Sequence, residues 1–245
     1  DRLLLFVAEA ISSFLPGQAR ADVHDQVLAT TIRLSRETED SDAWRSYTRA
    51  FIAEFAARGG DEYEATVRDF ASSENPDIAW RARRALAARG LVDADAIEAW
   101  RSADGSGEAA RMSVEALASL PLEDARSRAW EAGYSESLSN DFLTATLAGL
   151  NASSWEGVSG LDSAVDRLRP YWEAHTIGMA LRYANGVLAY GLDIDREGSV
   201  ERSVGLLRGW LDAHGDAPAQ LRRIVLEHLD AFERDERVQR RWGSG

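Results

Sequence analysis

The sequence predicts an all-α protein whose helices pair and stack into a curved α-α superhelix of the HEAT or armadillo type. Apolar residues recur at spacings of three and four almost from end to end, as at Trp44, Tyr47, Phe51 and Phe55, which is typical of amphipathic helices packed side by side. Strands are hard to place anywhere, because we find no sustained alternation of polar and apolar residues. Residues that favour helix ends fall between the apolar stripes.

Helix boundaries follow from these end signals. Asn75, Pro76 and Asp77 offer an N-cap, a proline at the first helical position and an early acid. Gly90 ends the helix that follows. On the same basis we expect helices near residues 2–15, 21–37, 41–57, 60–72, 77–89, 93–103, 107–119, 122–132, 138–150, 159–168, 171–190, 199–214 and 217–239.

Short loops join these predicted helices, so neighbours must pack antiparallel, and a long succession of such hairpins tends to form a curved solenoid. No strict repeat period emerges, although helix lengths suggest degenerate pairs of roughly 30 to 40 residues. No interdomain linker is evident. We therefore expect residues 1–245 to form a single helical domain.

Composition excludes several classes of function. The net charge of −13, from 41 acidic against 28 basic residues, argues against a nucleic-acid surface, because neutralising phosphates requires an excess of cations. The chain has no cysteine, which excludes disulfides, thiolate metal sites and thiol catalysis. Charged residues interrupt every apolar stretch well before the about 20 residues needed to span a bilayer. We expect a cytoplasmic protein with no nucleic-acid and no membrane partner.

The histidines do not form a zinc motif. They are His24, His175, His214 and His228, and none belongs to the helical His-Glu-x-x-His arrangement that puts two imidazoles on one face. We interpret His228, on an apolar stripe, as a core histidine. His214, beside Gly215 at a predicted helix end, is interpreted as a cap of backbone carbonyls. We predict no metal ligands in this chain.

Other motif-like stretches also lack what their chemistry requires. The run 193–198 imitates the opening of a calcium loop, but Val204 stands at the twelfth position, where a bidentate Glu is needed. Glycine-rich stretches at 157–160 and 59–60 lack the strand and the Lys of a phosphate-binding loop. No serine occupies a Gly-x-Ser-x-Gly elbow. We predict turns and loops here, and no catalytic or cofactor-binding residues.

Tryptophan is abundant, with eight residues. Their spread along the chain favours one buried ring per helical pair. A ligand platform would instead need several of them exposed in one cluster. The tryptophans lie at positions 44, 80, 100, 130, 155, 172, 210 and 242.

Several short motifs follow one another from residue 75 onwards. The stretch Asn-Pro-Asp-Ile-Ala-Trp-Arg at 75–81, with Ala-Leu-Ala-Ala-Arg-Gly at 85–90, resembles the D-x-D-L-R-W…L-A-x-x-G stretch in the C-terminal domain of actinobacterial aminopeptidase N enzymes. The other motifs resemble that family in the same order. Residues 120–130 resemble P-x-x-x-x-K-x-x-A-W, with Arg126 in the place of the Lys. The further marks are an acidic turn with a small-residue helix at 103–110, Leu-Ser-Asn at 138–140, and Leu-Arg-Arg-Ile-Val-Leu-Glu at 221–227.

The resemblance implies that this chain is the C-terminal part of a longer zinc metallo-aminopeptidase of the gluzincin type, which removes N-terminal residues from peptides. In that family the helical domain closes over the catalytic cleft, packs on the catalytic domain and restricts access to peptides. Zinc and its ligands belong upstream, so this fragment is expected to hold no cofactor and to be inactive alone. Its concave face is expected to offer polar or basic side chains to the peptide. Which arginines face inward stays open.

Two other hypotheses remain. A free-standing helical-repeat scaffold that binds a protein or peptide along its concave face would show the same periodicity. An all-helical enzyme in its own right would need a catalytic constellation, which the sequence does not display. An upstream His-Glu-x-x-His in the same open reading frame would favour the aminopeptidase, whereas a start codon close to Asp1 would favour the scaffold.

Overall fold

The computed structural model describes residues 17–38, 41–135, 138–152, 161–188 and 199–242, with scattered positions between 4 and 15. All regular structure within these residues is helical, which confirms the predicted fold class. The elements are α2 (Gly17–Glu37), α3 (Asp42–Arg58), the 3-10 turn η1 (Asp61–Tyr63), α4 (Glu64–Ala71), α5 (Pro76–Ala88), α6 (Ala94–Asp104), α7 (Gly107–Ala118), α8 (Glu123–Tyr134), α9 (Asn140–Asn151), α10 (Leu161–Asp166), α11 (Leu168–Ala174), α12 (Ile177–Leu188), α13 (Ser199–Ala213) and α14 (Ala219–Trp242).

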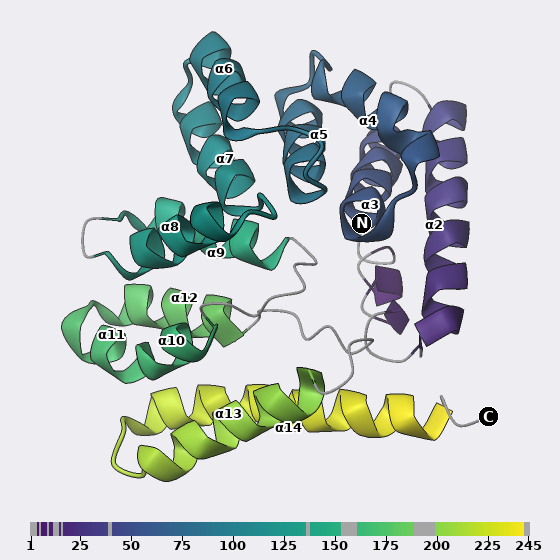
Figure 1. The fold of residues 1–245 in the computed structure, drawn as a ribbon. Helices are drawn as coiled ribbons and strands as arrows, with labels where there is room; N and C mark the ends of the chain where they lie inside the picture. Colours follow the sequence, from purple (N-terminus) through teal and green to yellow (C-terminus); the bar gives the residue numbers. More distant parts are fainter. Residues whose placement is uncertain are drawn as a thin grey trace.

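The helices form hairpins whose second members stack on one another. The hairpins are α2/α3, α4/α5, α6/α7, α8/α9, α10 and α11 with α12, and α13/α14. Contacts then run from α3 to α5, α5 to α7, α7 to α9, α9 to α12 and α12 to α14. Figure 1 shows α3, α5, α7, α9 and α12 on the inner side of an open arc, with α2, α4, α6, α8 and α11 outside them.

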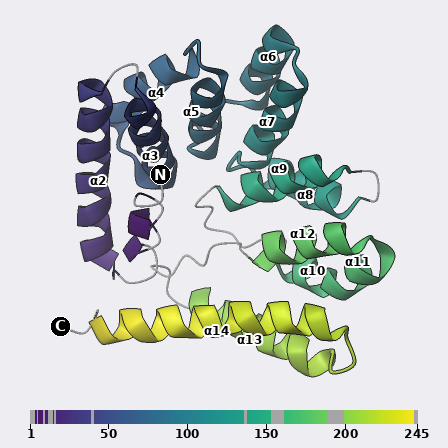
Figure 2. The same ribbon diagram turned by 180° about the vertical axis from the view of Figure 1, so that it is seen from behind.

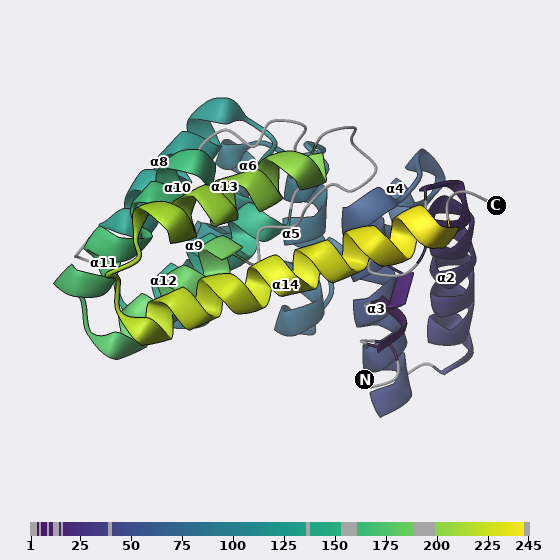
Figure 3. The same ribbon diagram turned by 90° about the horizontal axis from the view of Figure 1, so that it is seen from below.

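The arc curves round towards its own start. Figures 1 and 3 show the C-terminal end of α14 lying close to the end of the molecule formed by α2 and α3. The view from behind in Figure 2 shows the same succession of pairs, from α2 through α5 and α7 to α12 and α14. The predicted curved superhelix is therefore the observed arrangement.

Local sequence explains where many of these helices begin and end. The Ser41 hydroxyl accepts from the backbone N–H of Trp44 at 3.1 Å, and the Ser106 hydroxyl accepts from that of Ala109 at 3.0 Å. Such N-caps satisfy backbone donors that a helix leaves unpaired at its start. Gly105 ends α6 with a φ of 64°, a left-handed conformation that side chains with a Cβ rarely adopt.

Two large apolar clusters hold the arc together. One joins α2 to α5 around Phe51, Phe55 and Ile78, none more than 1% exposed. The other joins the end of α7 to α8–α14 and includes Tyr183 and Leu221, also at most 1% exposed. Complete burial of a side chain such as Phe or Leu contributes about 1.5–3 kcal/mol, so these clusters supply most of the cohesion within each half.

Two junctions in the second half are unusually close. An added Cβ at Gly149 of α9 would lie 2.2 Å from the backbone oxygen of Glu115 and 2.6 Å from the Cβ of Ala118 in α7. One at Gly186 of α12 would lie 2.9 Å from the Cβ of Leu147 in α9. Because real Cβ atoms do not approach neighbours so closely, glycine is what allows α7, α9 and α12 to pack at this separation.

Some predicted boundaries were wrong. Residues 171–190 were expected to form one helix, but the chain breaks between α11 and α12, where the backbone N–H of His175 bonds to the Tyr171 carbonyl and the Thr176 hydroxyl accepts from Met179. Pro170 was placed in a loop, yet it lies in the first turn of α11, where proline removes no helical hydrogen bond. Half of the residues of the helix predicted at 2–15 lie outside the described residues.

We expect Gly149→Ala to lower the free energy of unfolding by about 1–3 kcal/mol or more, because overpacking against a backbone carbonyl cannot be relieved by a side-chain rotation. The matched control is Gly209→Ala in α13, where a Cβ meets nothing within 4 Å. That change should raise stability by about 0.5–1 kcal/mol, because alanine favours the helix over glycine. Urea unfolding followed by circular dichroism measures both, and a neutral Gly149→Ala would contradict the close junction.

Candidate functional site

A charged face runs along α5, in the inner layer of the arc. Asp77, Arg81 and Arg84 recur at spacings of four and three, so they share one side of the helix. Arg83 lies on another side and donates to the Ala71 carbonyl of α4 at 3.0 Å. Because α4 belongs to the outer layer (Figure 1), the charged face of α5 is directed towards the inside of the arc.

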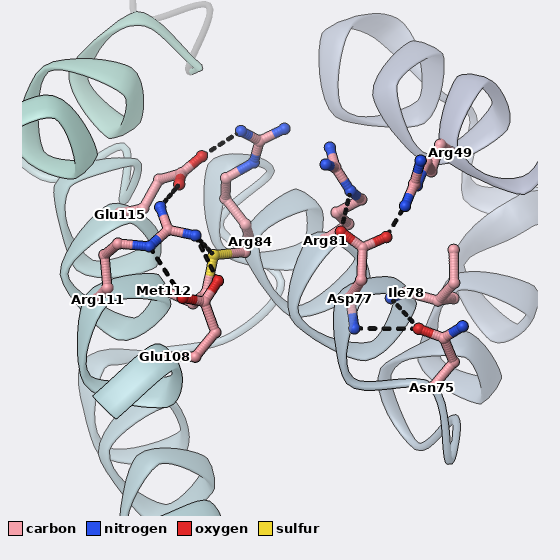
Figure 4. A network of polar contacts seen from close by, with 10 residues as sticks. All are labelled: Arg49, Asn75, Asp77, Ile78, Arg81, Arg84, Glu108, Arg111, Met112 and Glu115. Carbon is pink, nitrogen blue, oxygen red and sulfur yellow. Dashed lines mark hydrogen bonds and ion pairs between the residues drawn. The ribbon is translucent and has the colours of Figure 1, made fainter. Parts of the chain in front are cut away.

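Asp77 links the start of α5 to α3. The Asn75 side-chain oxygen caps α5 by accepting from the backbone N–H groups of Asp77 and Ile78, at 3.1 and 3.4 Å. One oxygen of the Asp77 carboxylate accepts from Nε of Arg49 in α3 at 2.8 Å, and the other accepts from Nε of Arg81 at 3.0 Å (Figure 4). The cap fixes the carboxylate between two arginines of adjacent helices.

The facing side of α7 carries a second set of ion pairs. Arg84 of α5 donates to the carboxylate of Glu115, which is itself only 10% exposed. Arg111 donates from Nε to Glu108 at 3.2 Å and lies 3.9 Å from the other oxygen of Glu115 (Figure 4). Glu115 is therefore shared between an arginine of its own helix and one of the neighbouring helix.

A groove separates these two sets of charges. Its volume, including the solvent at its mouth, is about 680 Å³. Pro76, Trp80 and Met112 form its apolar wall, and Trp80 is held from behind by a hydrogen bond from its Nε1 to Asp104 at 3.1 Å. The charged residues that line it are Asp77, Arg81, Arg84, Glu108, Arg111 and Glu115. We call this space the α5–α7 groove.

Two carboxylates of the groove, those of Asp77 and Glu108, have lowered pKa values. Burial alone raises the pKa of Asp77, but hydrogen bonds from Arg49 and Arg81 and their positive charges outweigh it, so the pKa falls below its ordinary 3.8. The hydrogen bond from Arg111 lowers the pKa of Glu108 below its ordinary 4.5. Three guanidinium groups and three carboxylates line the groove, so its charges balance in a chain of net charge −13.

The arginines of the groove retain donors for a ligand. Arg81 uses Nε for Asp77, and within the described part of the chain its two terminal nitrogens have no partner. Arg84 uses one terminal nitrogen for Glu115. A planar guanidinium with free N–H groups binds carboxylates in a bidentate manner. The groove can therefore hold an anionic group beside Arg81 and Arg84, and a cationic group beside Glu108.

Two histidines act as helix caps rather than as ligands. His214 Nδ1 lies 2.9 Å from the Trp210 carbonyl, which confirms the predicted cap. His175 repeats the arrangement on Tyr171, with 3.0 Å between Nδ1 and the carbonyl oxygen. In both pairs the imidazole also stacks on the aromatic ring four residues earlier, at centroid distances of 4.5 and 3.8 Å.

The other two histidines are structural as well. His24 of α2 pairs with Glu54 of α3, and both side chains are largely buried. His228 of α14 was predicted to lie in the core, but it is only half-buried, near Phe232; this burial lowers its pKa below the ordinary 6.5. Among the residues that the structure describes, no three His, Asp or Glu side chains are grouped to hold a metal ion.

The tryptophans lie where the sequence predicted, inside the fold. Trp80, Trp130 and Trp210 are at most 6% exposed, and Trp44, Trp100 and Trp172 pack partly buried against the apolar clusters. Trp155 and the side chain of Trp242 lie outside the described residues, as do the stretches 157–160 and 193–198. The Gly59–Gly60 stretch is a loop after α3, as predicted.

The residues of the α5–α7 groove were not predicted from the sequence. The spacing of Asp77, Arg81 and Arg84, and that of Glu108, Arg111 and Glu115, was visible once helices had been placed. Arginine and glutamate at such spacings are, however, typical of any solvated helix face. Only the packing of α5 beside α7 brings the two faces together, which is why neither could be singled out.

No protein-family model and no curated protein matches this chain. No helix within the described ranges combines the length and the apolar character needed to cross a membrane. The function has to be inferred from the sequence motifs and from the α5–α7 groove.

Asp77→Asn should make the protein less sensitive to acid. The pKa of Asp77 is lower in the folded state than its ordinary value, so its ion pairs stabilise the fold above the unfolded-state pKa of about 3.9, and this contribution is lost as the pH falls through the folded-state pKa. We expect the variant to be less stable at neutral pH and to lose less stability on acidification. Denaturant unfolding at neutral and acidic pH measures this, with exposed Asp95→Asn in α6 as the control. An equal loss in the variant and the native chain would contradict the role of Asp77.

Proposed function

We propose that this chain is the helical domain of a zinc-dependent aminopeptidase, where it encloses the catalytic cleft and gates the entry of peptides. The observation that carries the proposal is a groove lined with arginines inside an arc of helical hairpins. An arc of this kind presents an extended inner surface to a peptide, and the α5–α7 groove supplies directional contacts on that surface. The cytoplasmic location expected from the sequence belongs to the same proposal.

The positions of the family-like motifs support this proposal. The stretch 75–81 forms the capped start of α5 and contributes Asp77 and Arg81 to the groove. The acidic turn 103–110 joins α6 to α7 and contributes Glu108. Motifs that resemble the aminopeptidase family therefore supply both walls of the candidate site.

Another family-like position, Arg126, has a structural role. Its side chain is completely buried in α8, and one terminal nitrogen donates to the Leu150 carbonyl at the end of α9, at 3.4 Å. A buried cation beside a helix C-terminus is favoured by the partial negative charge of the carbonyl groups there. Arg126 therefore ties α8 to α9 and does not contact a peptide.

The groove would act by positioning. A carboxylate of the peptide would bind the free terminal nitrogens of Arg81, and a basic side chain would pair with Glu108. Ordering a peptide at several points lowers the entropy cost of bringing its scissile bond to a catalytic centre, and closing an arc over it excludes water. When bound in the catalytic domain, zinc would activate water or polarise the scissile carbonyl. Under this proposal its ligands belong to another part of the polypeptide.

The chain alone should fold, yet show no hydrolysis of an alanyl chromogenic substrate and no stoichiometric zinc. In the full-length parent, deleting it should expose the cleft and change the preference for peptide length. Circular dichroism, metal analysis and peptide-length kinetics measure these outcomes. Robust metal-dependent turnover by the isolated chain, or an unaltered length preference after deletion, would contradict the gating role.

In the parent enzyme, Arg81→Gln should raise the KM for long peptides by roughly ten-fold, because a charge-assisted hydrogen bond contributes about 1.5–3 kcal/mol. The KM for a short chromogenic substrate, which cannot reach the groove, should not change. Arg33→Gln is the matched control, since Arg33 also pairs with a carboxylate four residues away but lies on exposed α2. If both variants behave alike, Arg81 does not bind peptide.

A further inference from the structure

Successive junctions between the second helices differ in how firmly they are packed. At α7–α9 and α9–α12, Gly149 and Gly186 allow contacts so close that a methyl group does not fit. The α9–α12 junction is also tied by Asn151, whose side-chain amide donates to the Gly186 carbonyl at 3.0 Å. Close-packed interfaces of this kind resist deformation, because small displacements create overlap or empty space.

The α3–α5 junction is firm for another reason. Phe51, Ile52 and Phe55 of α3 share one apolar cluster with Ile78 and Leu86 of α5, and all are at most 1% exposed. Bending here would expose several large apolar side chains to water, which opposes the motion. The α3–α5 junction therefore moves as one body with the N-terminal half.

The α5–α7 junction has neither a close glycine contact nor a large apolar cluster whose buried members come from both of its helices. Those of the first cluster end in α5, with Trp100 of α6 packed partly buried against it, and those of the second begin with Ala118 at the end of α7. One hydrogen bond, from the Ser119 hydroxyl at the end of α7 to the Arg84 carbonyl at 3.5 Å, ties the two helices. The apolar contact between α5 and α7 is limited to Trp80 with Ala109 and Met112, and to the small cluster around Ala87 and Ala116. On the inner side the two helices are separated by the groove of about 680 Å³.

In the ion pair that bridges the groove, Glu115 can exchange one arginine partner for another. Arg84 joins Glu115 across the junction, while Arg111 of α7 approaches the other oxygen of Glu115 (Figure 4). If α5 moves away, Glu115 keeps a counter-ion within its own helix. Arg84 is 21% exposed, and its Nε is buried without a hydrogen-bond partner, so solvation would compensate for its lost pair. Separation does not leave a buried charge unpaired, which is the usual large cost.

We propose that the α5–α7 junction is the hinge of the superhelix, and that the Arg84–Glu115 pair is the latch that holds it in the arrangement seen here. The halves α2–α5 and α6–α14 move as rigid bodies about this junction. The apolar contact of Trp80 with Met112 is the pivot, and the groove is the space that widens or closes. The hinge is a property of this chain and does not depend on the aminopeptidase proposal.

The absence of cysteine permits a direct test by spin labelling and pulsed electron paramagnetic resonance. Ala57→Cys in α3 and Thr144→Cys in α9 form a pair that spans the junction, whereas Thr144→Cys and Glu227→Cys in α14 span only the second half. All three positions are exposed. With Arg84→Gln, the first distance distribution should broaden and shift, and the second should stay unchanged. Arg33→Gln, remote from the junction, should alter neither.

A second measurement keeps the test decisive if Arg84→Gln does not fold, as judged by circular dichroism. The protein with native Arg84 is compared at about 0.1 M and about 1 M salt. The higher salt shortens the Debye length from about 10 Å to about 3 Å and so weakens the latch. The distance across the junction should then broaden while the control distance does not. The hinge is refuted if the distance across the junction and the control distance respond equally. It is also refuted if the distribution across the junction stays as narrow as the control in high salt and in any folded Arg84→Gln protein.

Discussion

The structure depends on the stacking of one second helix on the next, from α3 through α5, α7, α9 and α12 to α14. Each of α5, α7, α9 and α12 lies between a hairpin partner and two stacked neighbours, so most of its surface must be apolar or small. Alanine and glycine meet this demand at the closest approaches, as Gly149 does against α7. Where larger apolar side chains meet instead, as around Phe51, the packing contributes most of the free energy that holds the half together.

Within this layer the facing sides of α5 and α7 are an exception, because both carry charged residues. Charges close to a protein interior are tolerated when they are paired and hydrogen-bonded. Asp77 satisfies this through Arg49 and Arg81, and Glu115 through Arg84 and Arg111. The pairs leave donors unused on the arginines, which is the property that makes the α5–α7 groove a candidate binding site as well as a structural junction.

Ligand binding and bending of the superhelix would then both occur at the α5–α7 groove. A ligand that competes with Glu115 for Arg84 would weaken the latch, and a ligand that bridges Arg81 and Glu108 would draw the two helices together. The differential affinity of a ligand for the two arrangements sets how far it can shift the equilibrium between them. An arc with a single compliant junction can therefore adjust its curvature to a peptide while both apolar clusters stay intact.

The sequence by itself determined the helical fold class, the stacked hairpins and most helix boundaries, because helical periodicity and capping are local properties of the chain. It also predicted the His214 cap from its place beside a helix end. It did not show the break after His175, where a side-chain cap outweighs continuous helical periodicity. Only the tertiary structure decided which of the 28 basic residues face inward and which acids they meet. Arg84 and Glu115 are far apart in the sequence, and they meet only because α5 stacks on α7. The sequence around either residue does not indicate its partner.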